Sequence, residues 1–286
     1  MSRPLVLISN ILSWLLGVSI AYGSNEPIEV LSLVVGFCAM MLVSVSVHYT
    51  NEYADYLTDA QTIRTAYSGG SGILSKGIVS RKVVLQAAWA TLLFGFSIQL
   101  LANHFGIHPW SATIMLGIGA VGGWMYSLPP LKLAWRGWGE LGNALLGANG
   151  LPVYGYIILM KRFDPWVSLA CLPFTLLAFN NLLAVTWPDR EADAHVGKKT
   201  LATRWPIKRL RILYTVVAIA SFCLLLLLFD WILPLEVVIA SLMALPLTIW
   251  GVKTYTQTKI SYASIYAMVT IMLMQTLAWF VIGLKM

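Results

Sequence analysis

The sequence predicts an all-α integral membrane protein with nine transmembrane helices, and three observations support this fold class. Of its 286 residues, 58% are hydrophobic and only 11% are charged, whereas a soluble domain carries about 25% charged residues. The charged residues are separated by uncharged runs, most of them long enough to cross a membrane as helices. The lysines and arginines also gather on one side of the resulting spans. This composition excludes a soluble globular enzyme.

The uncharged runs give the expected spans in order. They cover residues 4–25, 30–51, 83–131, 141–160, 165–188, 212–229, 237–252 and 260–284. The run 83–131 is too long for one crossing, and the polar and helix-breaking residues between Asn103 and Pro109 divide it into two helices. The run 237–252 is short, but residues 231–235 can extend it and place Trp231 at the membrane interface. The total is nine helices.

The positive residues support an odd number of spans. With the N-terminus in the cytoplasm, nine crossings place 16 lysines and arginines inside and only Lys161, Arg162 and Lys285 outside, as the positive-inside rule expects of short loops. We therefore expect a multi-pass protein of a cell inner or plasma membrane. Basic cytoplasmic loops also contact anionic lipid headgroups, so the net charge of +7 does not indicate nucleic-acid binding.

Two acidic clusters lie at the expected cytoplasmic ends of the second and sixth spans. Residues 51–59 read NEYADYLTD, and residues 189–201 read DREADAHVGKKTL. If both spans continue as helices, residues four apart share one helix face. The residues on these faces are Asn51, Asp55 and Asp59 in the first cluster, and Asp189 and Asp193 in the second. Glu52 and Glu191 point away from these faces.

The two acidic faces are candidates for binding metal ions. Stacked carboxylates repel each other unless a cation neutralises them. Magnesium prefers oxygen ligands and typically joins one or two carboxylates to substrate phosphates. Because the two spans are four crossings apart, both faces open on the same side and can hold a diphosphate through Mg²⁺. The alternative is that these acidic residues are only the solvated ends of the two spans, which would need no bound metal. An ion site in a cation-coupled transporter is the rival function, but such sites usually lie near the bilayer midplane.

Several residues near the clusters are candidates for contact with the diphosphate. Arg64 and the glycine-rich stretch 68–72 follow the first cluster, and Lys198 follows the second. Tyr126 and Lys132 flank the two prolines that close the fourth span. These residues also have simpler explanations. The glycine-rich stretch can be a flexible connector, the lysines can follow from the positive-inside rule, and Tyr126 can be an interfacial tyrosine. We interpret Asn180 and Asn181, within the sixth span, as residues of helix packing.

These motifs resemble those of the UbiA-type intramembrane prenyltransferases, whose two aspartate-rich motifs lie at the cytoplasmic ends of the second and sixth of nine helices. The resemblance extends over about residues 4–284. It implies a single domain, 1–286, with two loosely repeated halves of about 1–137 and 138–286 and a cavity that opens sideways to lipid. It further implies that Mg²⁺ binds an isoprenyl diphosphate. The implied metal ligands are Asn51, Asp55, Asp59, Asp189 and Asp193, and the implied diphosphate contacts are Asn51, Arg64, Tyr126, Lys132 and Lys198.

The resemblance also indicates a branch of the family. The tracts YSGGSGILSKGI and YSLPPLKLAWRGWGELGN are most similar to branches that make menaquinone or related quinones and chlorins. The resemblance to the family implies loss of diphosphate to give an allylic cation, which an aromatic ring or another lipid acceptor attacks. We favour a 1,4-dihydroxy-2-naphthoate-like acceptor, and 4-hydroxybenzoate, homogentisate, chlorophyllide or a glyceryl lipid remain alternatives. Glu52 replaces the more usual aspartate of the first motif and is expected to leave metal binding intact.

Overall fold

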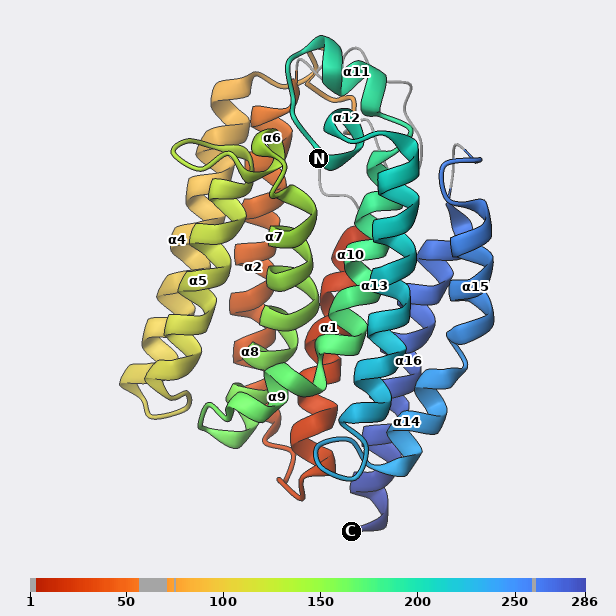
Figure 1. Ribbon diagram of the computed structural model, residues 1–286. Coiled ribbons are helices and arrows are strands. Elements are labelled where there is room, and N and C mark those ends of the chain that lie inside the picture. Colours follow the sequence, from red (N-terminus) through yellow and green to blue (C-terminus); the bar gives the residue numbers. More distant parts are fainter. Residues whose placement is uncertain (1–3, 57–70, 75, 259–260) are drawn as a thin grey trace.

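The protein is a bundle of helices (Figure 1), seen in a computed structural model that describes residues 4–56, 71–74, 76–258 and 261–286. In these ranges the named elements are all helical, in agreement with the predicted fold class. In order they are α1 (Pro4–Gly23), α2 (Val30–Ala54), α4 (Arg81–His104), α5 (Trp110–Ser127), α6 (Leu133–Arg136), α7 (Gly139–Leu145), the π-helix η1 (Leu146–Gly150), α8 (Leu151–Met160), α9 (Pro165–Ala170), α10 (Leu172–Thr186), α11 (Arg190–His195), α12 (Leu201–Arg204), α13 (Ile207–Leu227), α14 (Leu235–Leu242), α15 (Leu245–Thr254) and α16 (Tyr262–Lys285).

Among the residues that the structure describes, six segments are long and apolar enough to cross a membrane. They are α1, α2, α4, α13, α16 and the combined segment Leu235–Thr254 of α14 and α15. The other predicted spans correspond to α5 and to two interrupted columns, α7–η1–α8 and α9–α10. Each predicted run is therefore helical, while the total of nine crossings stays a prediction. Large apolar side chains such as Phe94 and Leu227 are exposed on the outside of the bundle, as lipid contact requires.

The break predicted inside the run 83–131 is confirmed. Helix α4 ends at His104, and α5 begins after Pro109. The Asn103 side-chain amide closes the connection by donating to the His108 carbonyl oxygen over 2.9 Å. A proline just before the first turn suits a helix start because its ring fixes φ near the helical value.

The first acidic motif continues past the end of α2, and the second begins after the end of α10, which corrects the expectation of continuous helices. Helix α2 ends at Ala54, with Asp55 as its C-terminal cap. Helix α10 ends at Thr186, and a turn separates it from the short α11, which carries Asp193. Pro188 explains the second interruption, because a proline has no N–H to continue the helical hydrogen bonds.

Small residues bring α1 close to α8 in the core of the bundle. A Cβ at Gly17 would collide with the Pro152 carbonyl group, and one at Gly155 would collide with the Trp14 carbonyl. Close backbone approach through small residues is a common mode of helix association in membranes. The short helices α6, α11 and α12 gather at one end of the bundle, and the end of α16 lies at the other (Figure 1).

Candidate functional site

The first acidic motif is fixed by the last residue of α5 and by α6. The Asp55 N–H donates to the Asn51 carbonyl oxygen over 2.9 Å. The Ser127 hydroxyl donates to Asn51 Oδ1 over 2.7 Å, and the Trp135 indole N–H donates to Asp55 Oδ1 over 3.3 Å. Both oxygen-bearing side chains of the motif are thus held by residues about 80 positions away.

The second motif forms one helical turn beside a buried lysine. The Asp193 N–H donates to the Asp189 carbonyl oxygen over 2.8 Å, which keeps the predicted four-residue spacing. Asp193 is 3% exposed, and its Oδ1 lies 3.4 Å from Lys198 Nζ. Gly197, with φ of 78°, allows the tight turn between them. This arrangement places a buried carboxylate and an ammonium in direct contact.

Lys198 also brings the two motifs together. Burial alone would lower the pKa of Lys198, but the carboxylates of Asp55 and Asp193 outweigh burial and raise it above its usual value. The pKa of Asp193 is raised, first by burial and also by the nearby charge of Asp55, while Lys198 acts in the opposite direction. One carboxylate from each motif, Asp55 and Asp193, therefore interacts electrostatically with the Lys198 ammonium.

Two glutamates that the sequence did not single out hold the loops of the two motifs. Glu52, 3% exposed, accepts two hydrogen bonds of 3.0 and 3.1 Å from the Ser71 N–H and another from the Ser71 hydroxyl. Glu140, also 3% exposed, accepts from the Leu201 N–H over 3.2 Å. The sequence predicts only that Glu52 lies away from the Asn51–Asp55–Asp59 face, and it gives no role to Glu140.

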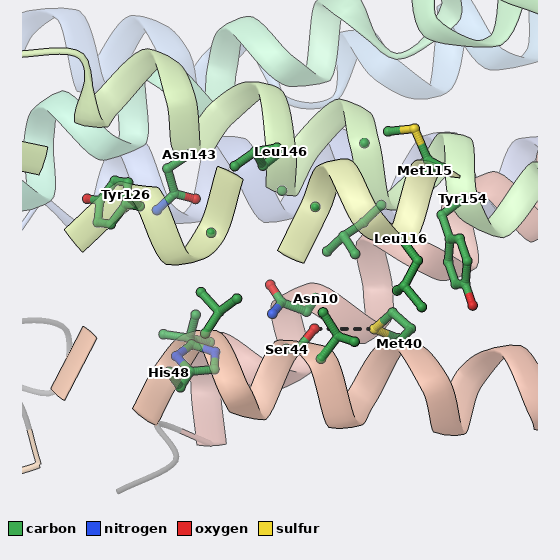
Figure 2. Close-up of a pocket in the computed structure, with 18 of the residues that line it drawn as sticks. Asn10, Met40, Ser44, His48, Met115, Leu116, Tyr126, Asn143, Leu146 and Tyr154 are labelled. Carbon is green, nitrogen blue, oxygen red and sulfur yellow. Dashed lines mark hydrogen bonds between the residues drawn. The ribbon is translucent and has the colours of Figure 1, made fainter. Parts of the chain in front are cut away.

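An elongated pocket begins beside the first motif and runs into the bundle (Figure 2). The volume of the pocket is about 140 Å³, which is smaller than a typical ligand pocket of about 300–1,000 Å³. Asn51, His48 and Tyr126 line it near the motif, and its deeper lining is mostly apolar. The pocket could therefore receive a ligand that has a polar head and an apolar tail.

The other predicted residues fall at different places. Tyr126 lies near Lys198 and Asp55 and interacts with both charges. The Lys132 ammonium lies 5.6 Å from the centre of the Trp135 ring. The Asn180 amide donates to the Tyr214 carbonyl oxygen of α13 over 3.0 Å, so its interpretation as a residue of helix packing is confirmed.

Part of the predicted site lies outside the described residues. This applies to Asp59, Arg64 and residues 68–70. Within the described ranges, no three His, Cys, Asp or Glu side chains cluster as a metal site. Asn51, Asp55 and Asp193 nevertheless supply oxygen donors of the kind that magnesium prefers, and two of these three carry negative charge beside the pocket.

Solved structures with a similar fold include two archaeal proteins. One is a UbiA homologue from Archaeoglobus fulgidus bound to GPP and Mg²⁺, with a TM-score of 0.70 and 18% identity over 99% of this chain and 96% of that chain. The other is the apo structure of a UbiA homologue from Aeropyrum pernix K1, with a TM-score of 0.75 and 14% identity over 95% and 97%. At these identities, the similarity establishes the fold alone.

Curated relatives are similar over part of their length. The 1,4-dihydroxy-2-naphthoate octaprenyltransferase of Bacillus subtilis is 24% identical over 71% of this chain and 63% of its own. The chloroplastic chlorophyll synthase of Oryza sativa is 26% identical over 57% of this chain and 43% of its own. The alignments thus span between about two fifths and two thirds of these relatives. The model of the UbiA prenyltransferase family matches residues 11–271, and the chain belongs to this family.

Proposed function

We propose that the protein transfers an isoprenyl group from an isoprenyl diphosphate to an aromatic acceptor in a Mg²⁺-dependent reaction. The observation that carries this proposal is that Asn51 of the first motif lines a mostly apolar pocket, while Asp193 of the second motif lies 3.4 Å from Lys198, which also interacts electrostatically with Asp55. A diphosphate is bound through cations, and the carboxylates of this site can hold them. An isoprenyl chain needs apolar surroundings, and the pocket supplies them.

The residues of the motifs would hold the donor. Asn51, Asp55, Asp59, Asp189 and Asp193 would bind Mg²⁺, which supplies positive charge to the departing diphosphate. Lys198 would add a fixed ammonium there, and Arg64, Tyr126 and Lys132 are the further candidates for contact with the diphosphate. Once the carbon–oxygen bond breaks, the apolar pocket wall keeps water from the allylic cation. The acceptor carbon can then form the new bond and release its proton.

For the acceptor we propose a 1,4-dihydroxy-2-naphthoate-like quinone precursor. We also propose that the protein crosses the membrane several times and that the end with the acidic motifs faces the cytoplasm. The similarity to the Bacillus subtilis octaprenyltransferase supports this choice. The similarity to the rice chlorophyll synthase makes chlorophyllide the second candidate acceptor. The two acceptors can be separated directly, because their prenylated products differ in mass and absorption.

The test uses purified protein in lipid nanodiscs with Mg²⁺, isoprenyl diphosphates and a panel of naphthoate, hydroxybenzoate, homogentisate, chlorophyllide and glyceryl-lipid acceptors. We expect Asp55→Ala and Asp189→Ala to abolish diphosphate release, whereas Glu236→Ala, a half-exposed acid on α14, keeps it. Normal turnover in both aspartate variants would refute the metal assignment. Transport of a solute into sealed vesicles with no consumption of donor would instead indicate a carrier.

A further inference from the structure

The pocket is lined by three rows of residues that have the same length and direction. The rows run along α2, along α5 and along the column α7–η1–α8, and in each the first and last lining residues are 11 positions apart. At a rise of 1.5 Å per residue, each row is about 16 Å long. The rows begin at Asn51, Tyr126 and Asn143 and end at Met40, Met115 and Tyr154.

Figure 2 shows that the two ends of these rows are far apart, with Tyr126, Asn143 and His48 at one end and Met40, Met115 and Tyr154 at the other. The first end adjoins the acidic motifs, because Asn51 and Tyr126 belong to it. A donor whose diphosphate lies at the motifs must therefore direct its chain toward the second end.

The second end is closed by fixed side chains. Tyr154 is 2% exposed, and Met40 is 1% exposed. The Tyr154 hydroxyl donates to Gln99 Oε1 over 2.9 Å and lies 3.3 Å from the Gly36 carbonyl oxygen. These bonds hold the ring across the pocket. Tyr154 is also the last residue that the column α7–η1–α8 contributes to the lining of the pocket.

Gly119 leaves the wall of the pocket open partway along its length. It lies one turn before Gly123 and one turn after Met115 on α5, and a Cβ built on it meets no atom within 4 Å. From the helical rise, Gly119 is about 10 Å from Tyr126 and about 6 Å from Met115. A side chain at this position would therefore fill the distal part of the pocket and leave the part next to the motifs free.

We propose that Gly119 and the closed end formed by Met115 and Tyr154 set the length of isoprenyl chain that the pocket accepts. The inference rests on the proposed function, since it concerns the donor of that reaction. An isoprenyl chain that fits the pocket is stabilised by the burial of each of its methylene groups. A chain that meets an added side chain must bend or displace its neighbours, and such overpacking is unfavourable.

The test compares Gly119→Leu with Gly117→Leu. Gly117 lies on the same helix but does not line the pocket, and a Cβ there reaches only Phe96 at 4.0 Å. The kcat/KM is measured with dimethylallyl, geranyl, farnesyl and geranylgeranyl diphosphates. We expect Gly119→Leu to lower kcat/KM about tenfold or more for the longest donors while sparing the shortest. Gly117→Leu should keep the wild-type preference.

A second variant tests the opposite direction. Met115→Ala removes a flexible side chain from the closed end and should shift the preference toward longer donors. If Gly119→Leu and Met115→Ala both show the wild-type length profile, the chain does not occupy this part of the pocket and the inference is wrong, although the proposed function stands. If the wild-type protein turns over none of the donors, the proposed function is refuted and the inference with it.

Discussion

At the scale of single residues, Lys198 is the side chain that joins the two acidic motifs. The sequence predicts Lys198 as a contact of the diphosphate. In the structure the Lys198 side chain is 16% exposed and faces Asp193, whereas the adjacent Lys199 is exposed. Gly197 is a local signal for the turn between Asp193 and Lys198. The interaction of Lys198 with Asp55 cannot be deduced from local sequence, since the two residues are 143 positions apart.

Removing the Lys198 charge should destabilise the protein in the absence of Mg²⁺. Lys198→Met leaves Asp193 buried without its partner, and breaking a buried ion pair in this way costs about 3–5 kcal/mol. Mg²⁺ should restore part of the loss by supplying positive charge. Because the folded-state pKa of Lys198 is raised, its stabilising effect is complete below the usual lysine pKa and is lost only as pH rises through the raised value. The loss of stability in Lys198→Met should therefore be equal at pH 7 and pH 9, as measured by thermal unfolding in detergent.

The matched control is Lys199→Met, which removes an exposed lysine from the adjacent position. We expect it to leave the unfolding temperature nearly unchanged, since exposed charges contribute little. Equal unfolding temperatures for the two variants in Mg²⁺-free buffer would show that Lys198 does not neutralise the two carboxylates.

At the scale of elements, apolar runs predicted where helices exist better than where they end. The predicted second span ends at residue 51 and α2 continues to Ala54. The expected continuation does not hold at Asp55, which is the C-terminal cap of α2 and whose side chain accepts from the Trp135 indole of α6. Hydrophobic runs record contact with lipid and core, whereas these helix ends depend on hydrogen bonds with distant segments. Pro188 was the one local signal that could have marked the end of α10.

The loop that follows the first motif should depend on the buried Glu52 carboxylate. Glu52→Gln removes the charge and replaces one of the two oxygens that accept from the Ser71 N–H, and losing a hydrogen bond to a charged group costs about 1.5–3 kcal/mol. We expect trypsin to cleave faster after Lys76 in this variant. Glu191→Gln is the control, because the Glu191 side chain is 79% exposed and should leave cleavage at the wild-type rate. Unchanged cleavage in Glu52→Gln would mean that Glu52 does not hold this loop.

At the scale of the whole molecule, the two ends of the bundle carry different kinds of polar contact. One end holds the motifs and their shared lysine. The opposite end holds Lys161, whose ammonium lies 2.7 Å from Glu29 and donates to Ser32 Oγ and to the Ile107 carbonyl oxygen, both over 2.7 Å. These contacts join the α1–α2, α4–α5 and α8–α9 connections. The sequence predicted Lys161 only as one of the few positive residues of the outer side, because such a junction exists only after the helices have packed.

This separation predicts that Lys161 supports stability and leaves the motif end unaffected. Lys161→Met deprives Ser32 Oγ and the Ile107 carbonyl of their donor and should lower the free energy of unfolding by about 1–3 kcal/mol. Arg162→Met is a close control, because the Arg162 side chain is 67% exposed and pairs with Asp164, two residues away, over 2.8 Å. The unfolding temperature should fall for Lys161→Met and change little for Arg162→Met, while both keep the wild-type response to Mg²⁺. A weakened Mg²⁺ response in Lys161→Met would show instead that the two ends of the bundle are coupled through α2 and α8.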